Sequence, residues 1–159
     1  MNRTRGFSLI ELMIVVAVIS IIIAMAIPNL VQSRIAANEA SALSSVRSIT
    51  SAQLVYSATE TQGNFAASLA DLNAIQLIDG ALAAGEKDGY AFTTAGGPGG
   101  FTVSASPVSE STGRRYFFSD ETAVIRFSVG GPADASSTPM GNSGIAIGSN
   151  SVVALSTAR

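Results

Sequence analysis

Residues 5–27 read RGFSLIELMIVVAVISIIIAMAI, and this stretch decides how the chain is organised. From Leu12 to Ile27 every residue except Ser20 is apolar. A helix over residues 7–27 would be about 30 Å long, which matches the hydrocarbon core of a bilayer. Because Arg3 and Arg5 precede it, the positive-inside rule predicts a cytoplasmic N-terminus and an outward-facing remainder.

The composition of the whole chain narrows the class of protein. Of 159 residues, 47% are hydrophobic and 13% charged, which argues against a solvated, disordered chain. Outside the apolar stretch about 130 residues remain, enough for one modest domain. The absence of Cys and His excludes disulfides, Cys/His zinc sites, Cys nucleophiles and His-based triads. A net charge of -2 argues against a broad basic face for nucleic acid.

The apolar stretch admits three interpretations. Ala24-Met25-Ala26 fits the cleavage site of a secretory signal peptide, and a plain membrane anchor has the same composition. Neither explains Glu11, because a carboxylate in an apolar helix costs a few kcal/mol at membrane depth. Its place near one end of the stretch, within reach of headgroup water, lowers that cost. The third interpretation makes Glu11 a functional residue with a partner of its own.

The N-terminal sequence also carries a family resemblance. Residues 5–16, RGFSLIELMIVV, resemble the prepilin signature of type IV pilins and of the pseudopilins of type II secretion. The resemblance implies that a dedicated membrane peptidase cuts after Gly6, removing a leader of residues 1–6, and that the new N-terminal Phe7 is N-methylated. Pro28 matches a proline that recurs in the family just after the apolar stretch.

The same resemblance implies a role for Glu11. A carboxylate on a neighbouring subunit's helix would neutralise the protonated amine of Phe7 in an apolar filament core, where an unpaired charge would be prohibitive. Because the cost of burial offsets much of the Coulomb attraction, the pair is expected to set axial register more than to add stability.

The segment after the apolar stretch is predicted to continue the helix. Pro28 lacks a backbone donor, so we expect a kink or a local opening there, with Asn29 as an alternative cap of a new helix. Residues 29–62 form an amphipathic helix in this interpretation, following the hydrophobic helix of 7–28. Its apolar residues recur at about helical spacing: Ile35, Leu43, Val46, Ile49 and Tyr56. Arg34, Glu39 and Arg47 are interpreted as solvated or subunit-contact charges.

Residues 63–159 are predicted to form a head of loops and antiparallel strands. Gly63-Asn64 ends the helix, a short helix is expected within 65–78, and 80–89 reads as a small-residue loop. Four strands are expected, at 90–94, 101–105, 115–119 and 123–129, with turns at 96–100 and at Asp120-Glu121. Residues 130–144 read as a surface loop, and 145–147 and 152–155 as edge strands.

The predicted fold class is therefore α+β. It consists of a long N-terminal helix, kinked near Pro28, packed against an antiparallel sheet of about four strands, an order similar to that of pilins. The helix stripe Leu43, Val46, Ile49 and Tyr56 should cover the sheet face formed by Tyr90, Phe92, Phe101, Val103, Phe117 and Phe127.

We predict no catalytic, cofactor or metal site. The glycine-rich residues 96–100 lack the Gly-Lys-Ser/Thr of a phosphate loop, and Asp120-Glu121 are adjacent in a turn rather than in a cleft. Those two acids and Asp134 are too scattered for the calcium loop usual in the major pseudopilin. Without Cys, the C-terminal loop lacks the disulfide of many pilins. Arg114-Arg115 could form a basic stripe that contacts DNA along a filament, although a solvated strand end is the favoured interpretation.

The resemblance implies a structural subunit and not an enzyme. It would lie in the inner membrane among lipid, meet the prepilin peptidase and methylase, pass to an inner-membrane assembly platform and join a helical homo-oligomer outside the cell. A pseudopilin of type II secretion or a minor pilin is the nearest alternative. A secreted or membrane-anchored binding domain, released after Ala26, is the more distant one. Twitching motility, adhesion, DNA uptake, secretion and electron transfer are all compatible tasks of such a filament.

Overall fold

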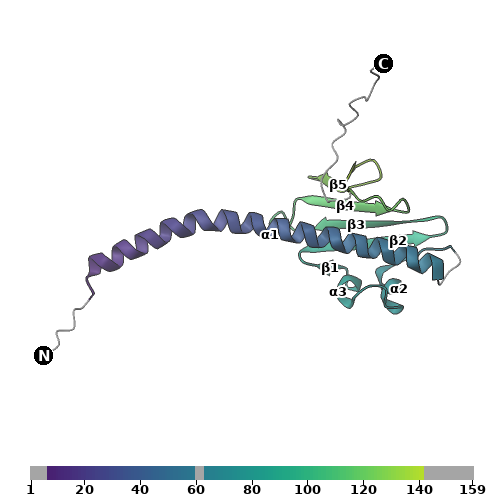
Figure 1. Ribbon diagram of the computed structural model, residues 1–159, viewed down its shortest axis with the longest axis horizontal. Coiled ribbons are helices and arrows are strands. Elements are labelled where there is room, and N and C mark those ends of the chain that lie inside the picture. The colour runs from purple at the N-terminus through teal and green to yellow at the C-terminus, as the bar shows by residue number, and fades with distance from the viewer. Residues whose placement is uncertain (1–6, 60–62, 142–159) are drawn as a thin grey trace, which may run out of the picture. The chain divides into compact units, whose positions relative to one another are not determined.

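The computed structural model describes residues 7–59 and 63–141 (Figure 1). The chain divides into two compact units, one up to Arg34 and one from Ile35 onward, and the helix α1 (Leu9–Thr59) belongs to both. We call the described part from Ile35 onward the head. The predicted leader 1–6 and the predicted edge strands 145–147 and 152–155 lie outside the described residues.

The head contains an antiparallel sheet in which six strands follow one another in chain order. They are β1 (Glu86–Lys87), β2 (Tyr90–Gly97), β3 (Gly100–Pro107), β4 (Arg115–Asp120), β5 (Arg126–Val129) and β6 (Thr138–Pro139). The α+β class is confirmed, but the expected number of about four strands is wrong. The predicted loop 80–89 contains β1 and a helical turn, and the predicted loop 130–144 contains β6. β5 begins later than expected, after Ala123 adopts the left-handed φ of 57°.

Two short turns set the register of the first three strands. Asp88 and Gly89 have φ of 49° and 74° and join paired residues of β1 and β2, the pattern of a type I′ hairpin that favours Asp-Gly. Pro98-Gly99 joins β2 to β3, so most of the glycine-rich segment predicted as a turn belongs to the strands themselves. Gly96 is required there, because a Cβ would lie 2.3 Å from the carbonyl oxygen of Ala66.

The core of the head lies between α1 and one face of the sheet (Figure 1). The predicted sheet residues Tyr90, Phe92, Phe101, Val103 and Phe117 are all buried, and Phe127 packs against them at the margin. On α1, Val46 and Ile49 are fully buried, whereas Leu43 and Tyr56 are partly buried. The predicted packing is therefore confirmed, with Ala42 and Ala52 as additional small residues that allow close approach of helix and sheet.

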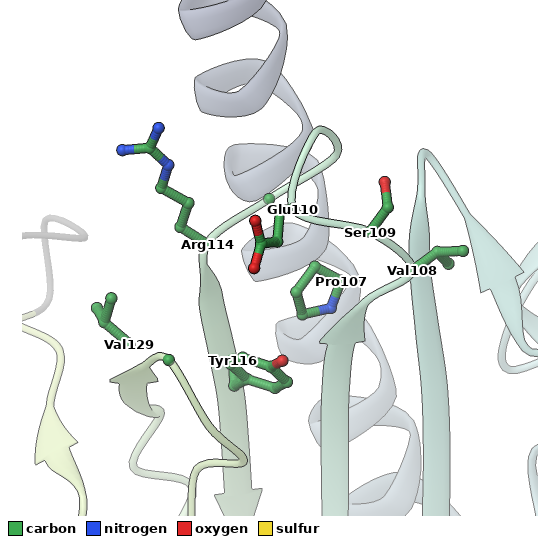
Figure 2. Close-up of a pocket in the computed structure, with 9 residues that line it drawn as sticks. Pro107, Val108, Ser109, Glu110, Arg114, Tyr116 and Val129 are labelled. Atoms are coloured by element: carbon green, nitrogen blue, oxygen red, sulfur yellow. The ribbon is translucent and has the colours of Figure 1, made fainter.

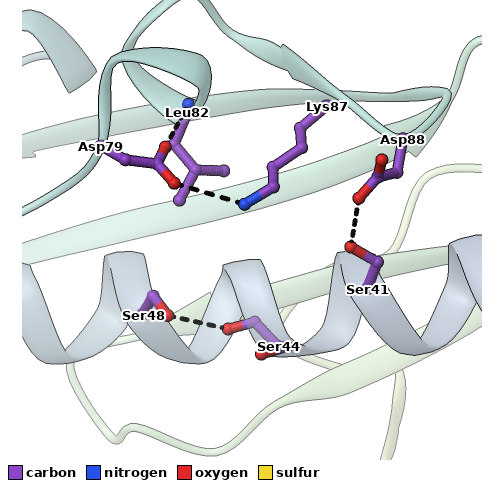
Figure 3. Close-up of polar contacts among 7 residues, drawn as sticks. All are labelled: Ser41, Ser44, Ser48, Asp79, Leu82, Lys87 and Asp88. Carbon is purple, nitrogen blue, oxygen red and sulfur yellow. Dashed lines mark hydrogen bonds and ion pairs between the residues drawn. The ribbon is translucent and has the colours of Figure 1, made fainter.

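Two short helices connect α1 to the sheet. α2 (Leu69–Ala74) begins with a capping box in which Ser68 and Asp71 each bond the other's backbone, and this confirms the helix expected within 65–78. α3 (Gly80–Ala83) is capped by Asp79, whose carboxylate accepts from the Leu82 N–H at 2.8 Å and pairs with Lys87 at 3.3 Å (Figure 3). The bond from Leu82 is the main reason that the pKa of Asp79 lies below its usual value.

Polar side chains of α1 attach the helix to the rest of the head. Ser41 Oγ donates to the Asp88 carboxylate at 2.6 Å, which fixes the β1–β2 turn against the helix (Figure 3). Gln53 is fully buried and bonds through both ends of its amide. Its Nε2 donates to the carbonyl of Ala66 and to Thr94 Oγ1, and its Oε1 accepts from the Ala66 N–H.

Tyr90 is a fully buried titratable group in the core. Its hydroxyl donates to the carbonyl oxygen of Arg115 at 2.9 Å. Burial, followed by the negative charge of Glu39, raises the pKa of the phenol above its ordinary value. The stabilisation that the neutral phenol provides is therefore complete below pH ~10, the unfolded pKa, and is lost as the pH rises above it.

We expect the free energy of unfolding of the head to fall by up to about 1.4 kcal/mol per pH unit above pH ~10, because the unfolded chain releases a phenolic proton that the folded chain keeps. Urea unfolding of the full chain in detergent across this range measures the slope. Tyr90→Phe should flatten it, whereas Tyr56→Phe, which leaves Tyr90 intact, should retain it. Equal slopes in the Tyr90→Phe variant and the unmodified chain would contradict this account.

Candidate functional site

The N-terminal unit presents an apolar surface that nothing in the described chain covers. Every side chain from Phe7 to Arg34 is exposed. The large hydrophobic side chains among them range from 41% exposed at Val31 to 75% exposed at Phe7 and Leu9. One 18-residue window of α1 has a mean hydropathy of 2.9 and no buried residue, so by length and composition this helix could cross a membrane. A helix that is apolar all round requires lipid or other apolar helices as its surroundings.

Glu11 is the acidic residue in the first turn of α1. The helix begins at Leu9, and the carbonyl of Ser8 accepts hydrogen bonds from the N–H groups of Glu11 and Leu12, at 3.1 and 3.2 Å. A carboxylate is favoured there because the N-terminal end of a helix carries partial positive charge. Phe7 lies two residues before the start of α1, whereas Gly6 lies outside the described residues. The predicted site residues Phe7 and Glu11 thus lie at the same end of one apolar helix.

Pro28 lies inside α1, which continues on both sides of it. Asn29 Nδ2 donates to the carbonyl of Met25 at 3.4 Å, and Ser33 Oγ donates to the carbonyl of Asn29 at 2.9 Å. Asn29 is therefore an interior residue of α1, and the alternative that it caps a new helix is wrong. The kink at Pro28 stays a prediction.

Glu39 has a structural role that the sequence did not reveal. Its Oε1 accepts from the backbone N–H of Arg114 at 3.0 Å, and its Oε2 lies 3.6 Å from the Nε of Arg115. The Arg115 guanidinium also lies over the ring of Phe127, 5.4 Å from its centre. Arg115 is therefore used within the head, and Arg114 is the exposed member of the pair. A basic stripe built from this pair would carry one unpaired charge per subunit.

The acidic residues considered for calcium make local turn contacts instead. Asp120 accepts from the backbone and the hydroxyl of Thr122, and Asp134 accepts from Ser136 and Ser137. The bonds from the two serines, Ser136 first, lower the pKa of Asp134. Within residues 7–59 and 63–141, no three Asp or Glu side chains come close enough together to hold a metal ion.

Comparisons with known proteins find similarity in the N-terminal region that contains Phe7 and Glu11. Residues 1–27 match the family model for the prokaryotic N-terminal methylation motif. The chain is also 45% identical over 51 residues to the type IV major pilin protein PilA of Myxococcus xanthus strain DK1622. That match covers 32% of this chain and 23% of the relative. No solved structure matches the chain significantly. The methylation motif, the similarity to a major pilin, and the long helix packed on an antiparallel sheet together support membership of the type IV pilin family.

Proposed function

We propose that this chain is the structural subunit of a type IV pilus filament. The observation that carries the proposal is the helix surface of residues 7–34, which is exposed throughout and interrupted at its start by the carboxylate of Glu11. Such a surface suits lipid before assembly and the helices of other subunits afterwards. One heterologous contact, repeated around a screw axis, then builds an open filament.

Processing prepares the helix for assembly in this proposal. A prepilin peptidase removes residues 1–6 by cutting after Gly6, and the same machinery methylates the new amine of Phe7. The subunit waits in the inner membrane and passes through an assembly platform to the cell surface. The amine of Phe7 and the carboxylate of Glu11 on a neighbouring helix then pair in the filament core, so that neither charge is buried alone.

The mature N-terminus tests the proposal directly. Mass spectrometry of sheared surface filaments is expected to find the chain beginning at N-methylated Phe7. A mature chain that begins at Ile27 would instead show cleavage after Ala26 and overturn the proposal in favour of a secreted domain.

A pseudopilin of type II secretion or a minor pilin would carry the same methylated terminus. The similarity to a major pilin favours the major subunit over both. In that case this chain is the dominant protein of the sheared fraction, and its deletion removes long surface filaments. If this chain is only a trace component of the sheared fraction, and filaments persist after its deletion, it belongs to one of the two alternatives.

A further inference from the structure

Four of the five exposed large apolar side chains of the head lie in two separate places, and Ile75 lies outside both. Within the described residues from Ile35 to Gly141, the exposed large hydrophobic side chains are those of Leu54, Val55, Ile75, Val108 and Val129. The two most exposed, Val129 at 65% and Val108 at 55%, line one groove of about 540 Å³. We call this the loop groove; Pro107, Glu110, Gly113, Arg114 and Tyr116 also line it. In Figure 2, Pro107, Glu110 and Tyr116 lie between the two valines.

The second place lies on the outer surface of α1. Leu54 and Val55 are 41% and 45% exposed, and they follow Arg47 and Ser51 on the same side of the helix. Arg47, Ser51 and Val55 together line a shallow hollow of about 430 Å³. We call the surface formed by Arg47, Ser51, Leu54 and Val55 the helix patch.

The loop groove lies beside the start of the head's part of α1, whereas the helix patch runs from Arg47, near the middle of that part, to Val55 toward its end. The segment that lines the groove is bonded to the start of the head's helix, through Asn38 to the carbonyl of Thr112 at 2.9 Å and through Glu39 to Arg114. Val55 follows Glu39 by more than four helical turns, a rise of about 24 Å at 1.5 Å per residue. Val55 therefore cannot reach the loop groove of its own subunit, whereas two unlike surfaces at separate places on the head suit a repeating contact between copies.

The charges beside the two surfaces are complementary. Glu110 lines the loop groove and Arg47 lines the helix patch, and among the described residues neither forms an ion pair. Arg114 also lines the groove, but Figure 2 shows its side chain extending away from Tyr116 and the groove floor. The carboxylate of Glu110 at the loop groove can therefore pair with the guanidinium of Arg47 at the helix patch of another subunit.

We propose that the loop groove of one subunit receives the helix patch of a second copy of this chain, with Glu110 facing Arg47. The proposal rests on the proposed filament and names the surfaces through which its heads touch. Val108 and Val129 are covered by Leu54 and Val55 in this contact. Because the contact joins unlike surfaces, every subunit offers one of each and the chain of contacts does not close.

Engineered cysteines test the contact without background, because the chain has no Cys. Filaments of the full-length Val55→Cys/Val108→Cys variant should form, on mild oxidation, a ladder of dimers, trimers and higher species on denaturing gels. The two positions are too far apart in one subunit for a disulfide, which requires Cα atoms within about 7 Å. Either single variant should stay monomeric, as should the control Val55→Cys/Ala135→Cys, whose second cysteine lies in an exposed loop outside both surfaces.

Charge reversal tests the pairing independently. Glu110→Lys and Arg47→Glu should each lower filament yield roughly fivefold, since each places like charges together at every contact, and the double variant should restore it to within about twofold. Glu121→Lys, an exposed acid outside both surfaces, serves as the matched control and should leave the yield unchanged.

The outcomes separate this proposal from the filament itself. Filaments that require Glu11 but give no cysteine ladder and no charge rescue overturn the contact and leave the filament intact. Dimers from Val108→Cys alone also overturn it, because they show two like surfaces meeting. An unmodified chain that forms no filaments in its own cells overturns both.

Discussion

Replacing Glu11 with alanine is expected to leave cleavage after Gly6 intact and to lower filament yield at least about a hundredfold. Removing one partner of a buried ion pair costs about 3–5 kcal/mol, and each 1.4 kcal/mol is a factor of ten in an association constant. The exposed apolar surface of residues 7–27 would still insert into lipid, so processing should proceed. In the filament, however, the amine of Phe7 would be buried without a counter-charge.

The measurement compares subunit in sheared filaments with subunit in whole cells, together with the N-terminal sequence of each. Glu11→Gln separates charge from shape, because it keeps the side-chain volume and should fail as alanine does. Leu12→Ala, the neighbouring residue in the same turn, removes apolar volume without a charge and should assemble nearly normally. Normal filament yield from Glu11→Ala would refute the proposed role of Glu11.

The helix could be predicted from the sequence because its signals are local. An apolar stretch without Gly or Pro up to Ile27, followed by a long Gly-free segment, leaves few alternatives to one continuous helix. The structure places α1 over Leu9–Thr59, close to the predicted range. The alternative that Asn29 caps a new helix also rested on a local signal, because Asn is a favoured helix cap. In the structure its side chain instead donates to the carbonyl of Met25 within the same helix.

The sheet was predictable only where its strands are long. Aromatic and β-branched residues alternate in β2 and β3 and gather as Tyr-Phe-Phe in β4, but β1 and β6 have two residues each and carry no periodicity. β1 could still have been found from Asp88-Gly89, which is among the strongest short signals of a two-residue hairpin. β6 had no such signal, because its pairing with β5 depends on the path of the preceding loop.

The polar contacts that join the helix to the sheet could not be predicted from one sequence. Glu39 and Arg114 are 75 residues apart, and nothing local to either residue identifies the other. Gln53 appears among Ala, Ser and Gln residues that suit a solvated helix surface, yet it is fully buried. Such contacts depend on where the folded chain brings donors and acceptors together, and burial then makes each of them energetically important.

Gln53→Leu is expected to destabilise the head by about 3–5 kcal/mol, because it leaves buried backbone groups without partners. Leucine has a similar volume, so packing changes little. The N–H and the carbonyl of Ala66, which is 1% exposed, would both lose the amide that now satisfies them at 2.9 and 3.0 Å. Thr94 Oγ1 would lose a donor but would still donate to the carbonyl of Thr102.

Urea unfolding of the full chain in detergent measures this effect, and with a typical slope of about 1–3 kcal/mol per molar the midpoint should fall by roughly 1–5 M. Gln32→Leu is the matched control, because it makes the same replacement at an exposed position of the same helix outside the head and should leave the midpoint of the head unchanged. Gln53→Glu refines the test, since a carboxylate can still accept from the Ala66 N–H but cannot donate to the Ala66 carbonyl. If Gln53→Leu unfolded at the same urea concentration as the unmodified chain, the buried amide would not be what holds α1 to the segment around Ala66, and apolar packing alone would have to account for that contact.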